Sequence, residues 1–377
     1  WVCPQLDVSM MSGNTPDLLD LRAFNISKYA QKGVLEDLFP YVEQSGVLEK
    51  GDLPDNLLEG LTFDGKLVCM PLSFLVKGVV ARASQVEGDG SWTMEDVYRL
   101  TEQHPESVGG AVDDVYGQRA QVDWILGEFS SRYYLEAFVD WGKWECSFDS
   151  DGFRRLVEWA GRYGWTPEHI EERFETTVAE SIYIPQEVLL VSQDGLGFTT
   201  LAGVELQDGE EVCLQGYPTS DGRDYFPAYI NGGLGIASGS PHKEAAWEFL
   251  ECYLEVNSSM LWGGIPASKI KIRELYEKES TPDYVGDAAG GQEVMRIKGY
   301  VGVGRDYIPY YVIPKEQADA ILKAIETADF RPISETEEMI TKIVVEEAES
   351  YCHGDKSLEE VTRLIQNRVQ LLLNEVK

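Results

Sequence analysis

The stretch that decides the fold is Ser12–Leu21, SGNTPDLLDL, near the beginning of the chain. Gly-Asn-Thr-Pro is turn chemistry, and the apolar run Leu18–Leu21 that follows it is typical of a short buried strand. The next residues, Asn25–Ala30, have a helix-like pattern that ends at Gly33. A strand, a loop and a helix within about 20 residues indicate one layer of a parallel α/β fold.

Strands and helices continue to alternate along the rest of the chain. Gly60–Met70 is predicted to form a hairpin around Asp64-Gly65, and Phe74–Arg82 is predicted to form a long apolar strand. Gly216–Ile230 is rich in Gly, Pro, Asp and aromatic residues, which indicates a long irregular connection. Helical patterns are predicted from Thr93, Gln121, Gly152 and Lys243, and two amphipathic helices capped by Ser334 and Ser357 close the chain.

Length and charge restrict the class of protein. The chain has 377 residues, of which 65 are acidic and 32 basic, so its formal net charge is −33. This length predicts two domains or one bilobed unit. Such an acidic chain repels phosphates, which argues against nucleic acid as a partner and disfavours anionic lipid. Its apolar runs are far shorter than the roughly 18–20 residues that a membrane helix requires.

The sequence lacks the residue spacings that metal-binding and catalytic motifs require. The six cysteines lie at least 39 positions apart, and the four histidines form no HExxH motif or other metal-binding pair. Gly60–Lys66 matches GxxxxGK, but Leu67 stands where a magnesium-binding Ser or Thr is required, so an Asp-Gly turn explains it better. No GxSxG nucleophile elbow is present. The sequence therefore predicts no metal, no cofactor and no catalytic residues.

The positive signal is aromatic content. The 9 Trp, 19 Tyr and 13 Phe make up 11% of the chain, and several of them lie in turn-rich segments. Phe24, for example, follows Asp20 and Arg22 just beyond a predicted strand. Aromatic faces pack against the C–H faces of a sugar ring while charged side chains bind its hydroxyl groups, and ligands of open α/β sheets lie beyond the strand ends. This combination indicates an uncharged polyol as the ligand.

Six segments occur in an order that matches one known family. They are Gly13–Leu21 (GNTPDLLDL), Tyr29–Leu38 (YAQKGVLEDL), Asp64–Pro71 (DGKLVCMP), Ser91–Thr93 (SWT), Gly216–Gly222 (GYPTSDG) and, most specifically, Ser238–Leu250 (SGSPHKEAAWEFL). In this order they resemble the motifs of the extracellular solute-binding proteins of family 1, the maltose-binding-like receptors of ABC importers. The resemblance covers most of the chain.

This resemblance implies an α/β fold with two lobes, hinge strands and a ligand cleft, the periplasmic-binding-protein type II fold. Lobe one would comprise residues 1–77 and 231–285, and lobe two residues 82–229 and 286–377, with hinges near 77–82 and 226–231. Family members have a strand and a helix before the first motif, so we expect a trimmed chain. Some maltose-type members carry a stacking tryptophan near the position of 330–340, where this sequence has none.

The family's function would be to bind an extracellular carbohydrate in the cleft and to deliver it unchanged to an ABC transporter permease. It implies a monomer that acts outside the cell, lipid-anchored or periplasmic, and is no enzyme. We expect Asp20 and Arg22 to bind sugar hydroxyls and Asn231 to add a polar contact; the expected stacking residues are Phe24, Trp124, Tyr225 and Trp262. A surface ion pair for Asp20 and Arg22, and core packing for each aromatic residue, remain open.

Three other functions remain open at this point. A secreted acidic glycoside hydrolase also has rings and carboxylates in a cleft, and would need two carboxyl groups about 5–10 Å apart across the sugar. A solute-binding protein for a polyamine or a peptide fits the acidic charge. A sugar-binding sensory domain would have the same cleft without a permease partner.

Overall fold

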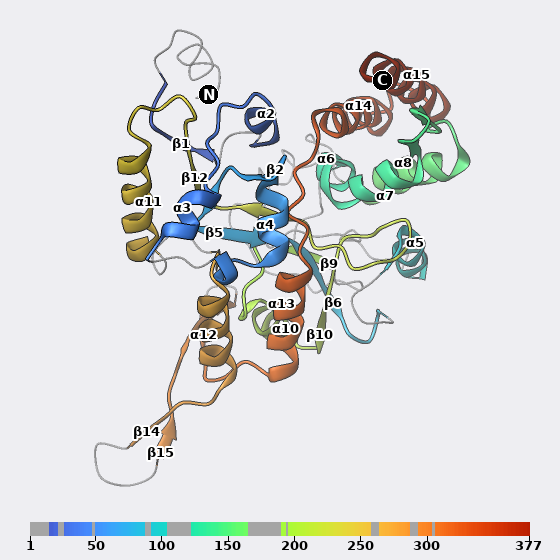
Figure 1. The fold of residues 1–377 in the computed structure, drawn as a ribbon. Coiled ribbons are helices and arrows are strands. Elements are labelled where there is room, and N and C mark those ends of the chain that lie inside the picture. Colours follow the sequence, from blue (N-terminus) through green and yellow to red (C-terminus); the bar gives the residue numbers. More distant parts are fainter. Residues whose placement is uncertain are drawn as a thin grey trace.

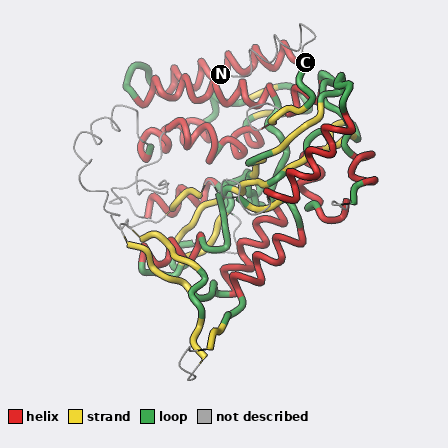
Figure 2. The backbone as a smooth tube through the Cα atoms, turned by 90° about the vertical axis from the view of Figure 1, so that its left-hand side faces the viewer, coloured by secondary structure: helices red, strands yellow, loops and turns green. Residues whose placement is uncertain are grey.

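The computed structural model describes residues 15–21, 26–46, 50–86, 92–103, 122–164, 190–193, 195–257, 264–286, 293–303 and 306–377. Helices surround a set of short central strands, as Figures 1 and 2 show from two directions (Figure 1, Figure 2). The strands form three sheets of three strands each, together with four two-stranded hairpins. This combination of helices and sheets in the described residues is an α/β architecture.

The three larger sheets carry the centre of the fold. Their orders are β1 (Leu18–Asp20), β12 (Gly233–Ile236), β4 (Met70–Pro71); β11 (Ala228–Ile230), β5 (Ser73–Val76), β13 (Ile265–Pro266); and β10 (Val212–Gln215), β6 (Gly78–Arg82), β9 (Leu190–Gln193). The four hairpins are β2 (Thr62–Phe63) with β3 (Lys66–Leu67), β7 (Val139–Asp140) with β8 (Glu145–Cys146), β14 (Tyr284–Gly286) with β15 (Glu293–Met295), and β16 (Gly299–Val303) with β17 (Asp306–Tyr310).

Strand β1 corrects one prediction. It lies where the sequence places it, but it pairs antiparallel with β12, with Leu18 opposite Ile236 and Asp20 opposite Leu234. A parallel layer is therefore wrong for this strand. The reason is the path of the chain, because the partner of β1 is not the next strand in the sequence but one more than 200 residues later, which enters from the opposite direction.

Helices fill the space around these strands. In the first half they are α2 (Ile26–Gln31), α3 (Phe39–Gln44), η2 (Lys50–Asp52), α4 (Asp55–Leu61), α5 (Met94–Gln103), α6 (Val122–Trp124), the π-helical turn η3 (Ile125–Phe129), α7 (Ser131–Ala137) and α8 (Asp151–Tyr163). In the second half they are α10 (Thr200–Asp208), α11 (Lys243–Asn257), α12 (Lys269–Ser280), α13 (Lys315–Thr327), α14 (Glu335–Cys352) and α15 (Leu358–Val376). Within the described part of the chain, no helix is both long and apolar enough to cross a bilayer.

Local sequence signals explain several element boundaries. Asp64 and Gly65, with φ of 48° and 77°, form the left-handed turn between β2 and β3. The Ser334 hydroxyl and the Glu337 side chain form a reciprocal capping box at the start of α14. The Ser357 hydroxyl accepts from Glu360 N–H at 3.2 Å to cap α15. The predicted turn and both predicted caps are therefore confirmed.

Three segments that are far apart in the sequence lie side by side, and we call them the crossing segments: 76–78, 226–228 and 328–330. The single strand predicted over Phe74–Arg82 is in fact two strands that join different sheets, with Lys77 between them. Lys77 N–H donates to Pro227 C=O at 2.8 Å, and Ala228 N–H donates to Asp329 C=O at 2.9 Å. Backbone hydrogen bonds thus hold the three segments side by side.

The buried apolar side chains of the described residues form two clusters, and the crossing segments contribute to the first. The first is built mainly from residues 19–76, 196–214 and 226–330, and the second from residues 92–163 and 340–373. Strand β6 contributes to both, because successive side chains of a strand point to opposite faces. Val80 packs into the first cluster, whereas Val79 and Ala81 pack into the second. The segments 196–214 and 313–330, which the resemblance assigns to lobe two, pack in the first cluster.

Candidate functional site

A cavity of about 610 Å³ lies beside the crossing segments, between the two clusters. All three crossing segments contribute to its wall through Lys77, Pro227 and Asp329. Leu21, Leu61 and Phe330 of the first cluster line it from one side, and η3, α7 and α14 contribute Glu128, Ser131 and Thr341 from the other. Its remaining lining residues are Ile26, Gly127, Tyr217, Tyr225, Ala228, Tyr229, Ile230, Arg331, Pro332, Ile333 and Glu338.

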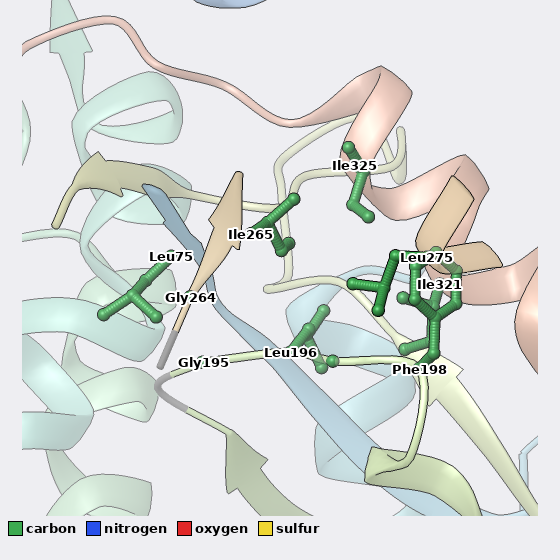
Figure 3. Close-up of a pocket in the computed structure, with 10 residues that line it drawn as sticks. Leu75, Gly195, Leu196, Phe198, Gly264, Ile265, Leu275, Ile321 and Ile325 are labelled. Carbon is green, nitrogen blue, oxygen red and sulfur yellow. The ribbon is translucent and has the colours of Figure 1, made fainter. Parts of the chain in front are cut away.

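A second pocket of about 240 Å³ lies among β5, β13, α12 and α13 (Figure 3). Its described lining residues are all glycines or large apolar side chains, which Figure 3 shows gathered around Ile265, Leu196 and Ile321. A polar solute would lose its hydrogen bonds to water there without gaining new ones. The larger cavity, which contains rings, hydroxyl groups and charges together, is therefore the candidate site.

Aromatic side chains line the cavity from the crossing segments. Tyr225 is half-buried immediately before the second crossing segment, and Tyr229 is 41% exposed immediately after it. Phe330, in the third crossing segment, is held by an edge-to-face contact with Phe74 at 4.9 Å between ring centroids. Rings placed on backbone that is hydrogen-bonded on both sides have little freedom to reorient, so they present fixed apolar faces to a ligand.

Two charged groups of the cavity wall, Lys77 and Asp329, are paired within the protein. Lys77 forms an ion pair with Glu128, and its ammonium group lies 5.2 Å from the centroid of the Tyr229 ring. Asp329 accepts a hydrogen bond from the guanidinium of Arg132 at 2.9 Å. Burial raises the pKa of the Asp329 carboxyl, and the positive charge of Arg132 opposes that rise. Burial also raises the pKa of the Tyr225 phenol, again opposed by Arg132.

The turn η3 explains how Glu128 reaches the cavity. The sequence predicts an ordinary helix over Gln121–Phe129, whereas the structure has a π-helical turn over Ile125–Phe129. Ser130 N–H donates to Ile125 C=O at 2.9 Å, five residues back, and the Ser130 hydroxyl donates to the same carbonyl at 2.8 Å. The wider turn brings Gly127 and Glu128 to the cavity wall while Ile125, Leu126 and Phe129 remain buried.

The predicted site residues lie at different positions relative to the cavity. Tyr225 lines the cavity. Asp20 is exposed at the end of β1, one residue before the lining residue Leu21. Asn231 directly follows β11, where its N–H donates to Ser73 C=O at 3.0 Å. Arg22, Phe24 and Trp262 lie outside the described residues. A ligand contact stays a prediction for each of these residues.

Trp124 lies behind the cavity wall. Its ring stacks on Phe129 at 5.6 Å and meets the edge of the lining residue Tyr217 at 6.0 Å. These contacts show that Trp124 packs against neighbouring rings, and a ligand contact stays a prediction for this residue as well. Trp124 supports a cavity-lining ring, and it does not itself appear in the described cavity wall.

Sequence reasoning missed several residues of the cavity wall. Lys77 carried a visible signal, because it is the single charged residue within the apolar stretch Phe74–Ala81. Asp329 and Phe330 follow the end of α13 and have no such signal. They reach the cavity only because the third crossing segment pairs with Pro227, a contact between positions far apart in the sequence.

Metal and thiol chemistry receive no support at this site. Within the described residues no group of three or more His, Cys, Asp or Glu side chains could hold a metal ion. Cys69, Cys146, Cys213, Cys252 and Cys352 are free thiols, and Cys3 lies outside the described residues. The described cavity wall contains none of these cysteines.

This architecture, with two α/β bodies, three crossing segments and a cavity between the bodies, is that of the extracellular solute-binding proteins of ABC importers. One structure with this fold is an extracellular solute-binding protein of family 1 from Alicyclobacillus acidocaldarius, with 12% identity, a TM-score of 0.55 and coverage of 98% of this chain and 87% of that chain. The predicted fold class and the resemblance to family 1 are confirmed at the level of the fold.

Two further structures share the fold. A cyclic alpha-maltosyl-1,6-maltose binding protein from Arthrobacter globiformis is 16% identical, with a TM-score of 0.56 over 99% of this chain and 88% of that chain. UgpB from Mycobacterium tuberculosis, in complex with glycerophosphocholine, is 17% identical, with a TM-score of 0.57 over 100% of this chain and 88% of that chain. No family model matches the sequence.

Proposed function

We propose that this chain binds an uncharged carbohydrate in the cavity and delivers it unchanged to an ABC-type importer. The observation that carries the proposal is that Lys77 and Asp329 are paired with Glu128 and Arg132, beside the rings of Tyr225, Tyr229 and Phe330. Paired charges bind hydroxyl groups well, since hydrogen bonds to charged groups contribute about 1.5–3 kcal/mol. A neutral polyol gains these bonds without a charge of its own to compensate.

Charged solutes fit this cavity less well. A polyamine would have to compete with Lys77 and Arg132 for the carboxylates of Glu128 and Asp329. A phosphodiester, such as the glycerophosphocholine bound to UgpB, would have to compete with those carboxylates for Lys77 and Arg132. Structures with this fold also bind neutral sugars, among them the cyclic maltosyl-maltose of the Arthrobacter protein. We therefore favour the carbohydrate over a polyamine, a peptide or a phosphodiester.

The remaining parts of the proposal concern closure of the lobes, the permease, the oligomeric state and the location of the protein. The two lobes would close on the sugar by bending at the hinges near 77–82 and 226–231, and the permease would recognise the closed form. A ligand shifts such an equilibrium only by its different affinity for the two states, so contacts from both lobes are required. We propose a monomer that acts outside the cell, lipid-anchored or periplasmic.

Thermal unfolding in the presence of candidate ligands tests the function. The panel contains neutral mono- and oligosaccharides, spermidine, short peptides and glycerophosphocholine. A sugar at 100 times its Kd should stabilise the protein by about 2.7 kcal/mol. If spermidine or a peptide raises the melting temperature and no sugar does, the carbohydrate assignment is wrong. Chromatography of the recovered sugar for new reducing ends distinguishes binding from glycoside hydrolysis.

A substitution then locates the site. Tyr225→Ala should weaken sugar binding by about 2- to 10-fold, the range of a lost aromatic contact. Tyr133→Ala is the matched control. The Tyr133 ring packs edge-to-face on Phe138, with 5.8 Å between the ring centroids, and Tyr133 is not part of the described cavity wall. Titration calorimetry measures both. Equal affinities for the two variants would place the sugar elsewhere.

A further inference from the structure

Arg132 occupies an unusual position in relation to the cavity. It lies on α7, next to the cavity-lining Ser131, and its side chain is only 10% exposed. It does not appear in the cavity wall itself. A buried guanidinium is costly to desolvate and is retained where its partners require it. Its partners are therefore the key to its role.

Two of those partners line the cavity. The Nη2 atom donates to Asp329 Oδ2 at 2.9 Å, and the guanidinium carbon lies 4.9 Å from the centroid of the Tyr225 ring. Asp329 belongs to the third crossing segment, and Tyr225 immediately precedes the second. A single side chain of α7 thus holds a carboxylate and an aromatic ring that come from two different parts of the chain.

Other acidic groups complete the surroundings of the guanidinium. Its Nε lies 3.7 Å from Glu136 Oε1, and its Nη1 lies 3.9 Å from Glu337 Oε1. Glu136 is also bound by Arg223. Three carboxylates therefore surround Arg132, but only Asp329 belongs to the cavity wall.

We propose that Arg132 is a positioning residue of the ligand site, which fixes the Asp329 carboxylate and the Tyr225 ring in their ligand-binding orientations without touching the solute. This inference rests on the proposed function, since it assigns how that site is preorganised. The planar guanidinium is needed for both contacts, because one face can lie over the ring while its edge donates to the carboxylate. A lysine ammonium is a point charge and can serve one partner well, but not both.

The proposal makes a prediction for pH. Asp329 is faced by Arg132 of α7, by Arg223 and Tyr225 of the connection, by Glu337 of α14, and by the N–H of Arg331 at 2.8 Å. Glu136 of α7 lies beside Arg132. A sugar hydroxyl donates a stronger hydrogen bond to the ionised carboxylate than to the protonated carboxyl group, so affinity falls as the pH falls through the pKa of Asp329. Burial raises that pKa and Arg132 opposes the rise, so removal of Arg132 moves the fall in affinity to a higher pH.

Three variants test the role of Arg132, with the sugar identified in the thermal screen as the probe. Arg132→Met should weaken binding by about 10-fold or more, the loss expected when a charged hydrogen bond disappears. Arg132→Lys should restore part of that loss. Arg155→Met is the control, because Arg155 also lies over a ring, that of Tyr98 at 4.2 Å, and also binds two carboxylates, Glu95 and Glu102. It should change affinity by no more than about twofold.

The pH profile separates positioning from general stability. Titration calorimetry from pH 5 to 8 should show the affinity of Arg132→Met declining at a higher pH than that of the wild type. If Arg132→Met does not fold, the same profile is measured on Arg132→Lys. Wild-type affinity with an unshifted profile overturns the inference and leaves the proposed function intact. A wild-type protein that binds no sugar overturns the proposed function itself.

Discussion

Gly60 lies where α4 meets the third crossing segment. A Cβ atom at this position would lie 2.4 Å from Phe330 Cβ and 2.6 Å from the Phe330 carbonyl oxygen. Gly60→Ala therefore has to displace the backbone of the crossing segment or the helix. We expect a loss of about 1–3 kcal/mol in the free energy of unfolding, as for other overpacked sites. Urea unfolding at neutral pH measures it.

Gly51 provides the matched control for this prediction. A Cβ there would meet no atom within 4 Å, and Gly51 lies in the same region of the chain. Gly51→Ala should change the free energy of unfolding by no more than about 0.5 kcal/mol. If Gly60→Ala is as stable as Gly51→Ala, α4 is not pressed against the third crossing segment.

Individual residues of the site could be predicted only where a local sequence pattern pointed to them. Tyr225 was singled out because it lies in a turn-rich connection, and it does line the cavity. Trp124 carried the same kind of signal but packs behind Tyr217. A ring in a turn looks the same in the sequence whether it faces a ligand or a neighbour, because the choice is made by tertiary packing.

At the scale of elements, helix ends were predicted better than strand partners. The caps of α14 and α15 depend on residues three positions apart, so a short stretch of sequence contains the whole interaction. The pairing of β1 with β12 depends on positions more than 200 residues apart. No local pattern reports such a pairing, which is why a parallel layer was predicted for β1 and an antiparallel one is found.

The last two helices are joined by a buried acidic group. Glu347 of α14 accepts from Lys356 Nζ at 2.7 Å and from Arg368 of α15 at 2.7 Å. Burial alone would raise the pKa of the Glu347 carboxyl, but these two hydrogen bonds outweigh burial and hold the pKa below its ordinary value. A lowered pKa means that the ionised form stabilises the fold.

A pH series tests this junction. The contribution of Glu347 should be fully present above the ordinary glutamate pKa of about 4.3 and lost as the pH falls through the lower pKa of the folded state. Glu347→Gln should therefore be less stable than the wild type at pH 7, and the difference should shrink as the pH falls below about 4.3. Urea unfolding at each pH measures it.

Glu375→Gln, at an exposed position on the neighbouring helix α15, is the control. It should remain close to the wild type throughout the series. A difference between Glu347→Gln and the wild type that stays constant down to pH 3 would contradict the linkage, and would indicate a packing effect of the substitution instead.

At the scale of the whole molecule, the cavity between two bodies predicts a change of shape on binding. A fully compact chain of 377 residues has a radius of gyration of about 21 Å. We expect the free protein to exceed this value and the sugar-saturated protein to approach it as the lobes close. Small-angle X-ray scattering with and without the sugar measures the difference. An unchanged radius at saturation would contradict closure about the crossing segments.

The assembly of the second cluster from early and late parts of the chain has a consequence for the order of synthesis. The second cluster takes its early members from residues 92–163 and its late members, such as Ile340, Ile365 and Leu373, from the last two helices. During translation, α8 therefore emerges long before α14 and α15, the two helices that pack against it. Until α15 has been made, this half of the protein has an uncovered apolar face, which is the state in which nascent chains aggregate or require chaperones.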